Sequence, residues 1–240
     1  MSKELPDPRI LLAETDWFSL EHAGGPASPD TPAKLECLQS SNVIAATAAI
    51  DHLWNDLLHQ GSLYSATPPA AKYVAAVLSH SCYRDGLTAS QRTRLLAWVA
   101  EVSYAVGVPR QRQLEEWFGP NAMHANPLHA QVQSIRPILF QAVSPYVQDS
   151  NPSVMEAALL AVVHLLDAPE NKHHRRVMSP KIREVLAVSS QKGYRDAAIY
   201  ALESWGEDVQ SLKDAAEPAK EDESDSFWNS GGEIMDEPPF

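Results

Sequence analysis

The sequence predicts an all-α protein, an α-solenoid of about four antiparallel helical pairs with a disordered acidic C-terminal tail. Three observations support this fold class. Apolar residues recur at the 3.6-residue period of amphipathic helices in six or more segments. Several of these segments open with a capping side chain, often followed by proline at the first helical position. Segments with the two-residue alternation of a strand are hard to find.

The first elements lie before residue 58. A short turn is expected over residues 15–23, ended by a Gly-Gly-Pro sequence. The next helix begins at Asp30 or Thr31, which precede a proline, and runs to about Ser40. Asn42 is expected to cap a further helix. Its inward stripe has the helical period and contains Val43, Ala46, Ile50, Leu53, Trp54 and Leu57.

The next pair covers residues 68–79 and 88–106. Thr88 and Gln91 have the spacing of a capping box, in which each side chain pairs with an exposed main-chain amide at the helix start. A glycine and a proline after residue 106 end the second helix. Residues 107–127 then break the rhythm, and we interpret them as an insertion holding one or two helical turns over residues 113–118.

The third pair covers residues 128–147, bent at Pro137, and a helix begun by Asn151. Ser179, followed by proline, is expected to start the fourth pair, which ends at Gly206. The second helices of the pairs therefore start near residues 42, 88, 151 and 193. Spacings of 46 and 42 residues match the roughly 40–47-residue period of HEAT and armadillo repeats, and the 63-residue gap includes the insertion.

Residues 17–80 also resemble an uncharacterised bacterial family of HEAT-repeat proteins. The matching segments are residues 21–27 (EHAGGPA), 30–32 (DTP) and 59–67 (HQGSLYSAT). The family often has an aromatic residue where Gly24 stands, so the packing there is expected to differ. The resemblance implies an α-solenoid and no established activity, and it carries over no catalytic residue.

Most of the negative charge lies at the C-terminal end of the chain. Of the net charge of −12, residues 206–240 contribute −9, since they hold eleven acidic residues and two lysines. We therefore expect an N-terminal segment at 1–15, a solenoid at 16–206 and a disordered tail at 207–240. Phe227 and Trp228 lie in this tail, as either incidental apolar residues or a docking motif.

Several functional classes are not expected. No signal peptide and no membrane-spanning stretch is visible, so we expect a cytoplasmic protein. Cys37 and Cys82 are expected to be buried thiols in a reducing compartment, with a disulfide between them as the alternative. No nucleophile motif, phosphate-binding loop or Cys-x-x-Cys pair is present, and we expect neither catalytic residues nor a cofactor.

Two sets of polar residues follow the helix that begins after Asn42. His52, Asp56 and His59 share one helix face and could ligate a divalent metal, but a solvated polar face is the preferred interpretation. The connection 59–67 is expected to turn at Gly61 and to end at a capping Thr67. Within this connection, Gln60 and Tyr64 are candidate ligand- or partner-binding residues.

Two further segments are candidate binding surfaces. Trp117 and Phe118 in the insertion form an interface candidate if they are exposed. Residues 172–195 carry seven Lys or Arg and one acid, and Arg175, Arg176 and Arg183 are the candidate contacts. This patch could be a solvated helix face, a dock for an acidic protein or the tail, or a nucleic-acid site.

The sequence thus predicts a non-enzymatic scaffold that binds a protein partner of unknown identity. A concrete form is an immunity protein that neutralises a toxin. The alternative is a nucleic-acid-binding protein or enzyme resembling the HEAT-like DNA glycosylases, which would use the basic patch around Arg175, Arg176, Arg183 and Arg195. The acidic tail argues against this alternative, because it would repel DNA.

Overall fold

The fold is described from a computed structural model that defines residues 5–40, 42–122, 126–187, 189 and 191–214. In these residues the regular secondary structure is helical apart from a two-stranded hairpin of β1 (Glu21–His22) and β2 (Gly25–Pro26). The α-helices are α1 (Pro8–Glu14), α2 (Asp30–Glu36), α3 (Val43–Asn55), α4 (Thr67–Ser79), α5 (Ser81–Arg84), α6 (Ala89–Tyr104), α7 (Val108–Phe118), α8 (Pro127–Val143), α9 (Pro152–Leu165), α10 (Arg175–Leu186), α11 (Lys192–Ser204) and α12 (Gln210–Asp214). The short 3-10 helices are η1 (Trp17–Ser19), η2 (Cys37–Gln39), η3 (His59–Gly61), η4 (Ser144–Gln148) and η5 (Pro169–His174).

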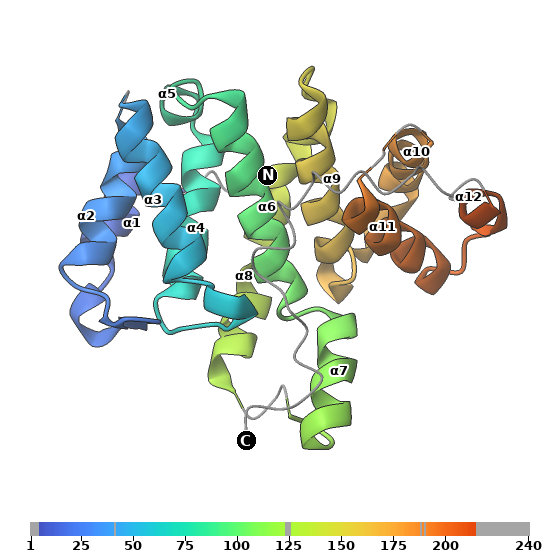
Figure 1. Ribbon diagram of the computed structural model, residues 1–240, viewed down its shortest axis with the longest axis horizontal. Helices are drawn as coiled ribbons and strands as arrows, with labels where there is room; N and C mark the ends of the chain where they lie inside the picture. The colour runs from blue at the N-terminus through green and yellow to red at the C-terminus, as the bar shows by residue number, and fades with distance from the viewer. Residues whose placement is uncertain (1–4, 41, 123–125, 188, 190, 215–240) are drawn as a thin grey trace.

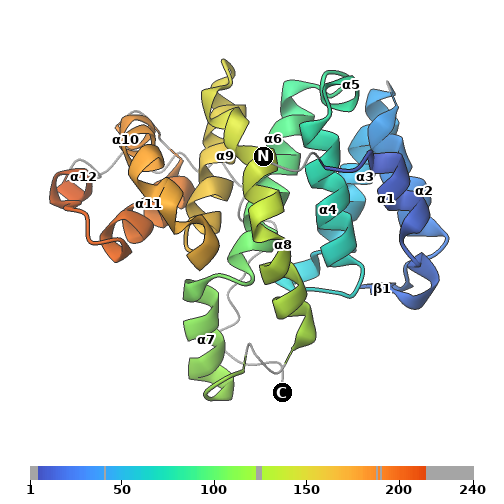
Figure 2. The ribbon, with the colours of Figure 1, turned by 180° about the vertical axis from the view of Figure 1, so that it is seen from behind.

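Two rows of helices make up most of the body (Figure 1). In one row α3, α6, α9 and α11 each pack against the next, and the contact between α6 and α9 is the most extensive in the molecule. In the other row α4 lies between α1 and α8, as seen from behind in Figure 2. The rows meet where α4 and α8 pack against α6. None of the described helices combines the length and hydropathy that crossing a membrane requires.

One continuous apolar core runs through both rows. Aromatic residues inside it use their polar atoms to join neighbouring helices. The indole N–H of buried Trp98 on α6 donates to the carbonyl of Leu53 on α3 at 2.9 Å. The hydroxyl of buried Tyr73 on α4 donates to the carbonyl of Leu35 on α2 at 2.7 Å. These bonds satisfy polar atoms that would otherwise be costly to bury, and they fix how the helices pack.

The three best-marked helix starts are confirmed. The Asn42 side chain accepts hydrogen bonds from two amides in the first turn of α3. Thr88 and Gln91 form the complete capping box of α6. The Asn151 side chain accepts from the amide of Val154 at the start of α9. In each case a short side chain supplies an acceptor that the first turn of a helix lacks.

The N-terminal segment departs from the prediction. Residues 8–14 form α1, capped by Asp7, whose carboxylate accepts from the amide of Arg9 at 2.8 Å. This helix packs on α4, so the segment belongs to the body. The turn expected over residues 15–23 becomes η1 followed by the hairpin strand β1. A helix of two turns gives too short a periodic pattern to be recognised in the sequence.

Four local predictions are wrong. Helix α10 begins at Arg175, so Ser179 lies inside it and donates to the Arg175 carbonyl instead of capping. Thr67 is the first residue of α4 rather than its cap. The insertion holds the eleven-residue helix α7 rather than one or two turns. Both cysteines are free, but Cys37 is only partly buried and Cys82 is exposed on the short helix α5.

The described chain continues beyond the predicted end of the body. Gly206 adopts a φ of 83° and ends α11, as its position in the sequence predicts. Residues 207–214 then carry buried Val209 and the short helix α12. The start of the expected tail is therefore part of the fold. Residues 215–240, with Phe227 and Trp228, lie outside the described residues.

Candidate partner-binding site

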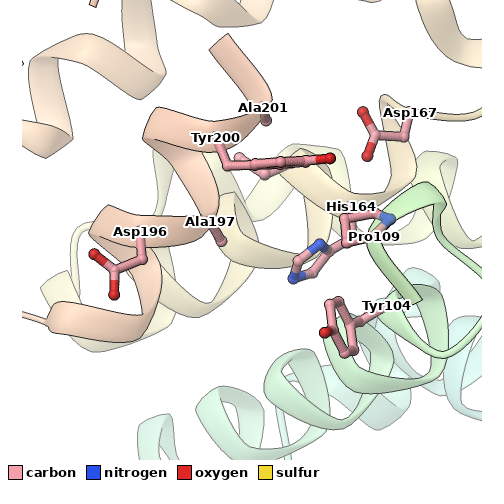
Figure 3. Close-up of a pocket in the computed structure, with 9 residues that line it drawn as sticks. Tyr104, Pro109, His164, Asp167, Asp196, Ala197, Tyr200 and Ala201 are labelled. Atoms are coloured by element: carbon pink, nitrogen blue, oxygen red, sulfur yellow. The ribbon is translucent and has the colours of Figure 1, made fainter. Parts of the chain in front are cut away.

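A cleft of about 230 Å³ lies where the α6–α7 junction, α9 and α11 meet. Figure 3 shows the side chains that line it. Tyr104 comes from the end of α6, His164 from the last turn of α9 and Tyr200 from α11. The remaining lining residues are small or acidic and are Pro109, Val163, Asp167, Asp196, Ala197 and Ala201.

His164 is the central polar residue of this cleft. Its ring centroid lies 5.3 Å from that of Tyr104, and neither ring nitrogen has a hydrogen-bond partner within the described chain. Burial lowers the pKa of His164 to about 4, so the ring is neutral at pH 7. A neutral imidazole presents one N–H donor and one acceptor, and here both are available to a guest.

Asp167 at one end of the cleft is already engaged. The indole N–H of Trp205 donates to its carboxylate at 3.1 Å, and the guanidinium of Arg175 lies 3.6 Å away. Arg175 in turn stacks over the Trp205 ring at 4.7 Å. Burial raises the pKa of Asp167, while Trp205 and Arg175 act in the opposite direction. The wall of the cleft therefore holds a compensated charge pair rather than a free carboxylate.

Beside the cleft, helix α7 projects from the two rows, as both views of the ribbon show. None of its residues is buried, and Trp117 and Phe118 at its end are 44% and 61% exposed. Their rings pack edge to face at 6.3 Å, and the guanidinium of Arg110 lies 5.5 Å from the centroid of the Trp117 ring. Stacking holds the aromatic pair in a defined arrangement while leaving it open to solvent.

The basic segment 172–195 is largely engaged within the fold. Arg183 donates to the Glu207 carboxylate through Nε at 3.0 Å and Nη2 at 2.7 Å. Arg175 donates to a main-chain carbonyl at 2.9 Å in addition to its contacts with Asp167 and Trp205. Arg176 is exposed and forms no ion pair or side-chain hydrogen bond with the described residues. Two of the three candidate arginines thus have partners within the fold, whereas Arg176 is exposed.

The α3–α4 connection places its two candidates differently. Gln60 is exposed, with a φ of 51°, and Tyr64 is partly buried. The Thr67 hydroxyl closes the connection by donating to the carbonyl of Leu57 at 2.6 Å and accepting from the Tyr64 amide at 2.9 Å. The candidate residues of this connection, of α7 and of α10 therefore belong to separate elements and do not form one site.

The expected solvated face at His52 is wrong. His52 is 3% exposed, and its Nε2 lies 2.9 Å from the hydroxyl of buried Thr31. Its Nδ1 lies 2.6 Å from the Asp56 carboxylate, and His22 packs edge to face on its ring. His59 points into solvent from η3. The helix thus turns His52 inward, because the hairpin and α2 cover the face that the sequence left open.

Metal coordination finds no support in this cluster. Within the described residues no group of three or more His, Cys, Asp or Glu side chains is arranged to hold a metal ion. The acceptor and donor needs of His52 are met instead by Thr31 and Asp56. A hydrogen-bonded core histidine accounts for the residues as they stand.

Comparison of the chain with protein-family models, with curated proteins and with solved structures finds no match. The function therefore has to follow from the chemistry of the site. The sequence does not reveal the cleft, because Tyr104, His164 and Tyr200 come from three helices and share no motif. The one available signal was His164, a polar residue at the end of the otherwise apolar helix α9.

Proposed function

We propose that this protein is a non-enzymatic scaffold that binds a protein partner through α7 and the cleft beside it. The observation that carries the proposal is the stacked, exposed pair Trp117 and Phe118 on a helix without any buried residue. Large aromatic side chains that remain exposed on a projecting element are typical of the anchors of protein interfaces. The aromatic content of α7 has no role in stabilising the core.

The two rows of helices support a more specific interpretation of the architecture. We propose that they are an α-solenoid of HEAT-like pairs, because successive long helices alternate between the rows and each row continues from neighbour to neighbour. Such arrays are used mainly to bind macromolecules along their surfaces. Neutralisation of a toxin by an immunity protein remains one concrete form of the proposal.

The proposal is tested by comparing two variants of the full chain in affinity purification from the native lysate. Trp117→Ala/Phe118→Ala should reduce the recovery of a stoichiometric partner at least about tenfold, since anchor residues contribute 2 kcal/mol or more. Phe18→Ala is the matched control, because Phe18 is 86% exposed on η1, away from α7. Equal recovery by the double variant, or no stoichiometric partner for the wild type, would contradict the proposal.

A further inference from the structure

The cleft of His164 has a size that restricts what it can hold. Its volume is about 230 Å³. Sites for drug-sized ligands occupy about 300–1,000 Å³, so this cleft suits a single large side chain or a comparable fragment. The rings of Tyr104 and Tyr200 border the space, and Val163, Ala197 and Ala201 supply apolar surface. A flat, largely apolar guest would fit these walls.

The electrostatics of the cleft favour a neutral guest over an anionic one. Burial lowers the pKa of His164, so the imidazole that faces the guest is neutral at pH 7. Asp167 is compensated by Arg175, and Asp196 is exposed at the edge with Lys192 at 3.8 Å. An anionic guest beside His164 would lie near the carboxylates of Asp167 and Asp196, and it would lose its hydration without gaining a counter-ion. A neutral polar group would instead complete the hydrogen bonding of the imidazole.

We propose that this cleft is an anchor pocket for one neutral aromatic side chain with a polar edge, tyrosine or tryptophan, supplied by a partner polypeptide. The ring of the guest packs on Tyr200 beside the adjacent rings of His164 and Tyr104, and its O–H or N–H pairs with a ring nitrogen of His164. This inference rests on the proposed function, and it adds one defined contact with the proposed partner.

Continuity with α7 points to a polypeptide as the source of the guest. Tyr200 on the cleft wall accepts a hydrogen bond from Arg112 of α7 at 2.9 Å. The cleft and the helix with the exposed aromatic pair therefore form one surface. A protein that covers Trp117 and Phe118 can place a residue in the cleft at the same time. Anchors of the two partners in an interface tend to pair in this way.

The test uses the full chain, with N-acetyl-tryptophanamide and N-acetyl-tyrosinamide as probes. We expect saturable shifts of the imidazole resonances of His164 and of the amides of Val163 and Ala201 in NMR titrations. A dissociation constant of about 1 mM is expected for a ligand of this size. The α-amide of N-acetyl-glutamate, whose side chain is anionic, should bind at least about tenfold more weakly, because Asp167 and Asp196 line the cleft and offer no counter-ion. Free indole should bind no more tightly than N-acetyl-tryptophanamide.

Two variants locate the binding. Ala197→Phe fills the cleft and should abolish the shifts, with Ala197→Leu as a milder alternative if the first variant has a lowered Tm. His164→Phe keeps a ring but removes both nitrogens. The His164→Phe substitution should weaken the binding of N-acetyl-tyrosinamide about five- to tenfold. The binding of N-acetyl-phenylalaninamide should change less, since only the tyrosine probe has a polar edge. Phe18→Ala should bind every probe as the wild type does.

Three results would overturn the inference. The first is the absence of saturable shifts up to about 20 mM probe, which is well above the expected dissociation constant. The second is equal or tighter binding of the α-amide of N-acetyl-glutamate, or tighter binding of free indole. The third is unchanged binding in Ala197→Phe. The proposed function is judged separately, by partner recovery with Trp117→Ala/Phe118→Ala. If no probe bound in the cleft but the double variant lost the partner, the pocket would be refuted and the scaffold function would remain supported.

Discussion

The hydroxyl of Tyr200 on α11 accepts a hydrogen bond of 2.9 Å from the guanidinium of Arg112 on α7, although 88 positions separate them in the sequence. It connects the projecting helix to the last helix of the row formed by α3, α6, α9 and α11. Helix α7 has otherwise few contacts with the body, mainly with α6. This bond therefore contributes to the position of the Trp117–Phe118 pair relative to the cleft.

Replacement of Arg112 by alanine should loosen α7 without unfolding the protein. Because Tyr200 is 37% exposed, the global free energy of unfolding should fall by less than about 1 kcal/mol. Hydrogen exchange of the α7 amides should accelerate several-fold, while that of α6 stays unchanged. Tyr200→Phe should reproduce the effect. Unchanged exchange in both variants would show that the bond does not restrain the helix.

The His52 cluster should be a strong local contributor to stability. His52→Ala leaves the hydroxyl of Thr31 and the carboxylate of Asp56 without their partner and opens a space in the core. We expect the free energy of unfolding in urea to fall by about 2–4 kcal/mol. His59→Ala on the adjacent exposed turn is the control and should change it by less than about 0.5 kcal/mol. A similar effect of the two substitutions would argue against the inward placement of His52.

Stability should decrease on mild acidification. Burial lowers the pKa of His52, against the raising effect of its bond to Asp56, and burial lowers that of His164 to about 4. Since a histidine in the unfolded chain titrates near 6.5, the unfolded state takes up protons first as the pH falls. The stabilisation is complete above about pH 6.5 and is lost progressively between pH 6.5 and about 4.

The contribution of His164 to this pH dependence should be about 1–3 kcal/mol, reduced from the full linkage value because the side chain keeps some solvent exposure. Urea unfolding of the wild type and of His164→Phe at pH 7.0 and 4.5 measures it, and the variant should lose less stability between the two values. An identical loss in both proteins would mean that the imidazole is not protonated on unfolding.

Binding to duplex DNA should be undetectable even at low salt. Arg183 is held by Glu207 and Arg175 by Asp167, so two of the arginines that the nucleic-acid hypothesis requires are already paired within the fold. Fluorescence anisotropy of a labelled duplex in about 20 mM salt should remain flat up to micromolar protein, since phosphate contacts dominate such binding at low salt. The nucleic-acid hypothesis would be supported instead if the protein bound DNA in a salt-sensitive way and if Arg175→Ala, Arg183→Ala and Arg195→Ala each weakened this binding.

The sequence by itself determined the helical class and most helix boundaries. Asn42, Thr88 and Asn151 mark helix starts by local chemistry, because a capping side chain and the amides it satisfies lie within three residues of each other. Gly206 marks a helix end for an equally local reason. The exposed pair at Trp117 and Phe118 was likewise visible, as aromatic residues in a segment that breaks the repeat.

The tertiary structure alone decided where the remaining polar residues lie. His52 faces Thr31 because α2 and the hairpin cover α3. The spacing of apolar residues along α3 does not indicate which distant segments pack on it. The cleft of Tyr104, His164 and Tyr200 likewise exists only because α6, α9 and α11 stack in one row. Local signals set helices residue by residue, whereas burial and charge pairing depend on residues distant in the sequence.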